Sequence, residues 1–71
     1  MCNNFEICAD TFIDGKPCIS VVTYSPGGAE IWLFIDRESH ELVAAQRIDG
    51  EWHDIDLEQA KQDYAGILYC I

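Results

Sequence analysis

The chain has 71 residues with a hydrophobic share of 49%, and its thirteen acidic residues against four Lys and Arg give a formal net charge of −9. A chain of this length buries only ~60% of the surface that its unfolded form exposes, so we expect a single domain over residues 1–71. The composition argues against disorder, and the apolar runs fall far short of the ~20 residues that a membrane-spanning helix needs. The negative field repels nucleic acid and anionic lipid, which leaves a basic protein as the favoured partner or a charge that serves solubility alone.

The first residues carry neither the basic nor the apolar region of a secretion signal, which predicts a cytoplasmic protein. In a reducing compartment we expect the four cysteines (Cys2, Cys8, Cys18 and Cys70) to be small core residues or free thiols. A Cys2–Cys8 or a Cys8–Cys18 disulfide stays open as an alternative, because spacing alone does not assign pairs.

The first two strands are predicted to form a hairpin. Residues 5–13 alternate, with mainly apolar odd positions, which predicts a strand with one inward face. Asp14-Gly15 is typical of a two-residue type I′ turn and leads into a second strand over residues 16–24. This register places Ile7 opposite Val22 and Phe5 opposite Tyr24.

Pro17 has no N–H to donate, so we expect the start of the second strand to lie at an edge or in a bulge. Pro26 and two glycines then predict a loop over residues 25–28. The following stretch, residues 29–36, contains five consecutive bulky apolar residues, and we interpret it as the central strand, buried on both faces.

A polar loop over residues 37–41 returns the chain into a fourth strand, residues 42–48. Its small residues Ala44 and Ala45 are predicted to lie opposite Leu33 and Trp32, small against large. A second Asp-Gly pair then turns the chain into a short fifth strand over residues 51–55.

One helix is predicted from Leu57 to about Leu68. Asp56 is a favoured N-cap, and Gln59 three residues later completes the pattern of a capping box. Apolar residues at spacings of three and four predict one stripe that docks on the sheet: Leu57, Ala60, Tyr64, Ile67, Leu68 and Ile71. The expected fold is therefore α+β, an antiparallel β-meander of four to five strands with one C-terminal α-helix packed on one face.

No motif predicts a metal or a cofactor. The cysteines and histidines contain no close ligand pair of the kind that structural zinc sites use. The series Asp54-x-Asp56-x-Glu58 begins like a calcium loop, but Gln59 and Ala65 stand where such a loop has its Gly and its bidentate Glu.

The sequence also predicts that the protein is not an enzyme, because no nucleophile and base are linked by a motif. A thiol activity that pairs Cys8 or Cys18 with His53 stays open as the enzymatic alternative.

The strongest functional feature is the acidic segment 49–63, where six acidic residues and one Lys give −6 + 1 = −5 of the net charge. Trp52 lies within it, and an aromatic residue inside a charged surface is typical of a binding hot spot. The alternative is that Trp52 packs under the helix. The predicted partner-binding residues are Asp49, Glu51, Trp52, Asp54, Asp56, Glu58 and Asp63.

In size, acidity and lack of catalytic motifs, the chain resembles phage-encoded inhibitors of host defence, DNA-mimic proteins and immunity proteins that neutralise basic toxins. This likeness is one of composition and covers no aligned motif. It implies a small non-enzymatic inhibitor that docks on a basic surface of a nucleic-acid-handling protein or a toxin. The alternative is a homo-oligomeric module, such as a homodimer, whose exposed strand edges pair with each other.

Overall fold

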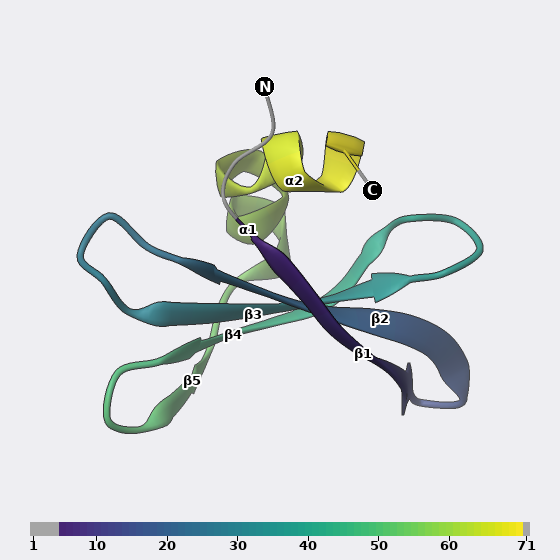
Figure 1. Cartoon of the computed structure of the whole chain (residues 1–71), viewed down its shortest axis with the longest axis horizontal. Helices are drawn as coiled ribbons and strands as arrows, with labels where there is room; N and C mark the ends of the chain where they lie inside the picture. Colours follow the sequence, from purple (N-terminus) through teal and green to yellow (C-terminus); the bar gives the residue numbers. More distant parts are fainter. Residues whose placement is uncertain (1–4, 71) are drawn as a thin grey trace.

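The computed structural model describes residues 5–70, except for the side chain of Cys70, and folds them into an antiparallel sheet followed by two short helices (Figure 1). The strands lie in the sheet in chain order, so the predicted α+β meander is confirmed. The elements are β1 (Glu6–Ile13), β2 (Lys16–Tyr24), β3 (Glu30–Asp36), β4 (Leu42–Ile48), β5 (Trp52–Asp54), α1 (Leu57–Asp63) and α2 (Ala65–Cys70). Cys2 and Ile71 lie outside the described residues. No helix of the described part is long and apolar enough to cross a membrane.

The β1–β2 turn is the two-residue turn that its sequence predicts. Asp14 and Gly15 have φ angles of +51° and +80°, and Ile13 lies directly opposite Lys16. The ladder shifts by one residue between Ile7 and Ala9, so Ile7 lies opposite Val21. The prediction that Ile7 faces Val22 is therefore wrong, because a bulge inserts one extra residue into β1.

β1 is an edge strand with little burial, which corrects the expected inward face. Ile7 and Ala9, which were expected to point inward, are exposed, Ile7 by 57%, whereas Phe5, just before the strand, packs against the core. Pro17, at the start of β2, pairs only with β1, because β3 ends at the residue opposite Cys18. The β2–β3 ladder does not extend to Pro17 and so needs no N–H from it, which is why a proline is tolerated there.

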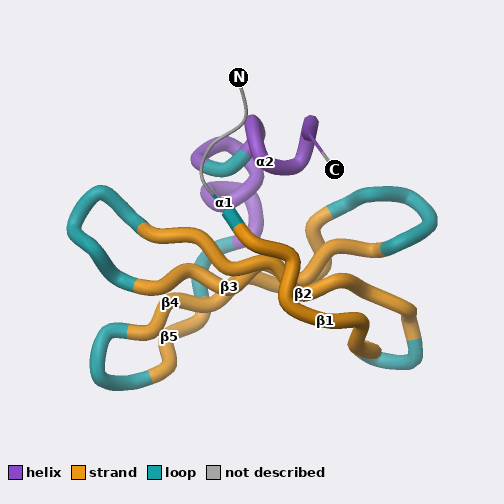
Figure 2. The backbone as a smooth tube through the Cα atoms, in the orientation of Figure 1, coloured by secondary structure: helices purple, strands orange, loops and turns teal. Residues whose placement is uncertain are grey.

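The central strand β3 is buried completely on one face only. Ile31, Leu33 and Ile35 are buried, whereas Trp32 and Phe34, which point to the opposite face, are only half-buried. The expectation of burial on both faces is wrong because the helices cover one side of the sheet (Figures 1 and 2).

Small residues of β4 do lie opposite large ones of β3, but both pairs differ from the prediction by one residue. Ala45, and not Ala44, is opposite Leu33, while Ala44 is opposite Phe34. Trp32 instead lies opposite Gln46.

The C-terminal segment forms two helices where one was predicted. Tyr64 has φ −115° and ψ 24° and ends α1, and its carbonyl accepts hydrogen bonds from the N–H groups of Ile67 and Leu68 at 3.0 and 3.1 Å. The break changes the direction of the chain and lets Ala60 of α1 and Ile67 of α2 both be fully buried against the sheet. A straight helix was expected because the spacing of the stripe continues through the break.

Half of the predicted capping box is present. The Asp56 carboxylate accepts a hydrogen bond from the Gln59 N–H at 3.3 Å, so Asp56 is the N-cap. The Gln59 side chain donates to Asp63 Oδ1 at 2.9 Å and does not return to the cap.

Candidate functional site

The sheet face that points away from the helices is not covered by them and carries both apolar and acidic residues. We call it the outer face and define it by two rows of residues that lie opposite one another across β2, β3, β4 and β5. The first row is Tyr24, Glu30, Ile48 and Trp52, and the second is Val22, Trp32, Gln46 and Asp54. Alternation along each strand places both rows on the side opposite the buried Val21, Leu33 and Ala45.

Trp52 is an exposed aromatic residue of the outer face. It lies opposite Ile48 at the edge of the sheet, and 60% of its surface is exposed. The alternative in which Trp52 packs under the helix is therefore wrong. At the other end of the same row Tyr24 is 63% exposed, so the row carries two exposed aromatic rings.

Carboxylates lie beside these rings. Glu30 is between Tyr24 and Ile48 in the first row, and Asp54 follows Trp52 on the same face. Asp49 and Glu51 are exposed in the turn between β4 and β5. An aromatic ring next to a carboxylate suits a Lys or Arg side chain of a partner, which gains both an ion pair and a cation–π contact.

The structure divides the predicted partner-binding residues into two groups. Asp49, Glu51, Trp52 and Asp54 belong to the outer face and its adjoining turn. Asp56, Glu58 and Asp63 belong to α1, where Asp56 caps the helix and both Asp56 and Asp63 accept hydrogen bonds from Gln59.

Sequence reasoning did not find Tyr24 and Glu30 as parts of this surface. Both stand in other elements, and only the strand register brings them into the row of Trp52. The signal that could have found them is the alternation of side chains along a strand. It places Tyr24 and Glu30 on the same face as Trp32 and Phe34.

Trp32 lies beneath the surface of the outer face. Its indole Nε1 is buried, and it is the one buried side-chain polar atom of the described residues without a hydrogen-bond partner. An unpaired buried donor costs about 1–3 kcal/mol, so this position is not optimised for stability.

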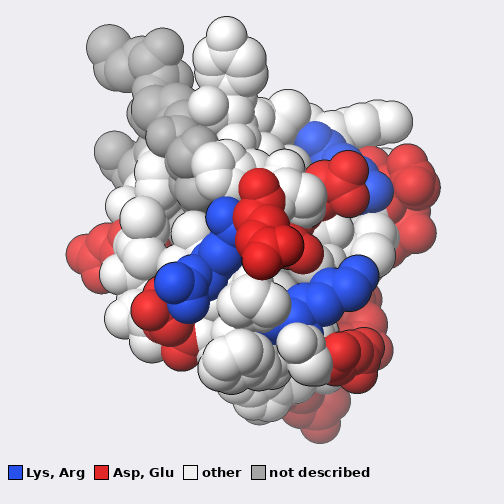
Figure 3. Space-filling view, turned by 90° about the vertical axis from the view of Figure 1, so that its right-hand side faces the viewer, with Lys and Arg blue, Asp and Glu red and all other residues white. Residues whose placement is uncertain are grey.

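Basic residues lie close to acidic ones beside the β1–β2 and β3–β4 turns, at the other end of the sheet from the β4–β5 turn. Arg37 pairs with Asp10 at 3.6 Å, and Figure 3 shows Lys and Arg side chains lying among acidic ones on this side. The N–H groups of Glu38 and Ser39 donate to Asp36 and lower the pKa of that carboxyl below 3.8. Asp10 and Asp36 at this end therefore have partners within the chain.

The thiols do not assemble with a histidine in the described structure. Cys8 is exposed, Cys18 is buried, and both are free, so the Cys8–Cys18 disulfide is absent. His53 on β5 is separated from Cys8 by four strand spacings, about 19 Å, and from Cys18 by three, about 14 Å. No group of three or more His, Cys, Asp or Glu side chains in the described part is arranged to hold a metal ion.

The fold and the outer face together define a small α+β meander with an acidic, aromatic surface. Searches against family models, curated proteins and solved structures find no match for this chain.

Proposed function

We propose that the protein is a small non-enzymatic binding module whose outer face docks on a basic surface of another protein. The observation that carries this proposal is the exposed Trp52, which lies between Asp54 and Glu51 in sequence and on the uncovered face of the sheet. Its partner is a protein that handles nucleic acid or a basic toxin, and the module inhibits that partner by covering its basic site.

Two physical features support this assignment. A partly exposed tryptophan supplies a large, rigid contact that is costly to leave in water, and such residues dominate binding energies. The neighbouring carboxylates attract a basic surface over long range and so raise the association rate.

The test compares two variants with the same change of net charge. Glu51→Lys with Asp54→Lys alters the outer face, and Glu38→Lys with Glu41→Lys alters the β3–β4 turn. Both change the net charge from −9 to −9 + 4 = −5. A partner is first identified by capture on the native chain across a salt gradient after nuclease treatment, and is then purified for kinetic measurements.

We expect the outer-face pair to lower the association rate with the purified partner by about tenfold at low salt, with a reduced salt dependence. The turn pair should have a much smaller effect. Trp52→Ala should weaken affinity by about thirtyfold, mainly through faster dissociation. Equal losses from both charge pairs, or full affinity in Trp52→Ala, would show that the partner does not bind the outer face.

A second candidate function, a homo-oligomeric module, is favoured by the β1 edge. β1 has eight residues, an edge that pairs with no other strand of the described residues, and the exposed side chains of Ile7 and Phe12. Two copies could pair through this edge across a two-fold axis, although Glu6 and Asp10 would then bring like charges together.

Light scattering of the purified chain decides between these functions. A mass of twice the monomer that reverts to the monomer in Phe12→Lys would support the module. A monomer at all concentrations would exclude the homo-oligomeric module and leave the binding function as the remaining candidate.

A further inference from the structure

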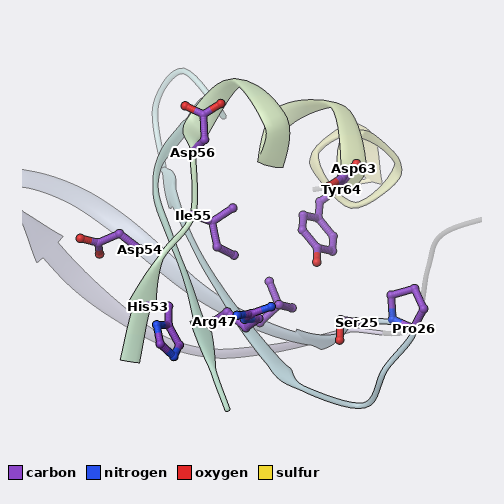
Figure 4. A pocket seen from close by; sticks show the side chains of 10 residues that line it. Ser25, Pro26, Arg47, His53, Asp54, Ile55, Asp56, Asp63 and Tyr64 are labelled. Atoms are coloured by element: carbon purple, nitrogen blue, oxygen red, sulfur yellow. The ribbon is translucent and has the colours of Figure 1, made fainter. Parts of the chain in front are cut away.

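A pocket of about 440 Å³ lies on the helix side of the sheet, where α1 ends above β4 and β5 (Figure 4). It is on the opposite face from Trp52, and Asp54, at the edge of the sheet, is the one outer-face residue in its lining. The residues that shape its interior are Ser25, Pro26, Arg47, His53, Ile55 and Tyr64.

Arg47 forms the charged part of the pocket. It lies directly opposite His53 in the β4–β5 ladder, so the two side chains share the helix-facing side of the sheet. Within the described part of the chain, the Arg47 guanidinium makes neither an ion pair nor a side-chain hydrogen bond, whereas Arg37 pairs with Asp10. The Arg47 side chain is exposed, so its guanidinium is free to pair with a carboxylate from solution.

Two hydroxyl groups add hydrogen-bond donors. The phenol of Tyr64 points into the pocket toward Arg47 (Figure 4), and its oxygen makes no hydrogen bond within the described residues. Desolvation, followed by the charge of Asp63, raises the pKa of Tyr64 above 10.0, so the phenol keeps its proton at neutral pH. Ser25 Oγ accepts from the Ala29 N–H at 3.1 Å, which leaves its own hydrogen free to donate.

Three carboxylates also line the pocket, and each accepts one hydrogen bond from a glutamine. Asp54 accepts from Gln46 Nε2 at 3.4 Å, Asp56 accepts from the Gln59 N–H at 3.3 Å, and Asp63 accepts from Gln59 Nε2 at 2.9 Å. In Figure 4 the Asp54 and Asp56 side chains point away from Arg47. All three carboxylates are exposed, so water screens their charge, and the interior itself presents the donors of Arg47, Tyr64 and Ser25.

From this arrangement we propose that the pocket binds a small monocarboxylate. The carboxylate pairs with the Arg47 guanidinium and accepts a hydrogen bond from the Tyr64 hydroxyl, and the apolar part of the ligand lies against Ile55 and Pro26. A single negative charge suits the site, because the net charge of −9 repels polyanions such as phosphates more strongly.

Sodium benzoate is the probe, and benzamide is its neutral analogue of the same shape. In a titration followed by ¹H–¹⁵N correlation spectra at constant ionic strength, benzoate should shift the amide signals of Ser25, Arg47, His53 and Tyr64 in a saturable way. Benzamide should bind at least about tenfold more weakly, because it does not pair with the guanidinium.

Arg47→Gln should weaken benzoate binding by about tenfold or more, and Tyr64→Phe by about threefold to tenfold. Arg37→Gln is the matched control, since it removes the same charge at the other end of the sheet and should keep the native affinity. Arg47→Lys keeps the charge without the forked geometry, so it should bind with intermediate affinity.

Four results would overturn the proposal: shifts confined to residues outside the pocket, no saturable shift, equal binding of benzamide, or native affinity in Arg47→Gln. The spectra of the variants also report whether each one is folded, and a folded Arg47→Lys carries the test if Arg47→Gln is not. Trp52→Ala should bind benzoate normally, so this result is independent of the outer face.

Discussion

Leu33 of β3 lies directly opposite Ala45 of β4, and both side chains are buried on the face that the helices cover. The small residue leaves room for the large one and for Ala60 and Ile67, which belong to the same buried cluster. The centre of the protein is therefore one cross-strand pair with two helix residues above it.

Leu33→Ala should lower the free energy of unfolding by about 2–5 kcal/mol, because the lost contacts leave a cavity that the sheet cannot close. A single core of this size supplies only about 3–5 kcal/mol, so the variant should be largely unfolded at room temperature. Urea denaturation followed by circular dichroism measures this. Phe12→Ala is the control, since Phe12 is 70% exposed and its loss should change stability by no more than about 0.5 kcal/mol. Similar losses in both variants would contradict the assignment of Leu33 to the core.

Gly15 and Gly27 provide a second matched pair. Gly15 has a φ of +80° with open space around its Cα, so Gly15→Ala should cost about 1–2 kcal/mol through backbone strain alone. The φ of Gly27 is not positive, and a Cβ there would meet only Ser25 Oγ at 3.9 Å. Gly27→Ala should therefore be neutral or stabilise by up to about 1 kcal/mol. Thermal unfolding of the two variants checks this order, and the difference would disappear if the β1–β2 turn did not use a positive φ at Gly15.

Most of the element order was predictable from local signals. The Asp-Gly pairs, the loop with Pro26 and the polar tract after Asp36 each mark a turn in the structure. These signals work because a positive φ or a fixed φ restricts the residue types that a turn can use.

The errors arose where position depends on distant parts of the chain. The bulge near Cys8 and the helix break at Tyr64 are produced by packing and leave the local pattern intact. The exposure of Trp52 depended on which sheet face the helices cover, and alternation alone gives two faces without saying which one is covered.

The pocket around Arg47 was out of reach for the same reason. Arg47, His53 and Tyr64 stand in three elements and share no motif. Only the β4–β5 register and the end of α1 bring them together.

Asp56 should contribute to stability through its cap. Asp56→Ala removes the acceptor for the Gln59 N–H and should destabilise the protein by about 1 kcal/mol, with a loss of helical signal. Asp54→Ala removes the same charge two residues earlier without touching the cap, so it should have less effect. Urea midpoints of the two variants provide the comparison. An equal effect would mean that the loss came from charge and not from the cap.

Asp36 should make the protein less stable in acid. Hydrogen bonds from the N–H groups of Glu38 and Ser39 hold its pKa below 3.8 in the folded state, so the folded protein binds protons less readily there than the unfolded chain. The stabilising effect is complete above 3.8 and disappears as the pH falls through the lowered pKa. Asp36→Asn, which keeps an oxygen acceptor, should show a smaller loss of stability below this pH. Parallel curves for urea midpoint against pH in the two proteins would contradict this role.

The two tryptophans should report their different surroundings separately. In Trp32→Phe the remaining Trp52 is 60% exposed, so its fluorescence should be red-shifted and strongly quenched by acrylamide. In Trp52→Phe the remaining Trp32 is half-buried with its Nε1 covered, so its emission should be blue-shifted and quenched less. Binding of a protein partner on the outer face should protect Trp52 from quenching and shift its emission to the blue, because the ring leaves water. Benzoate in the Arg47 pocket lies on the opposite face and should leave the emission maximum of Trp52 unchanged. A Trp52 that is already protected in the free protein would contradict its exposure on the outer face.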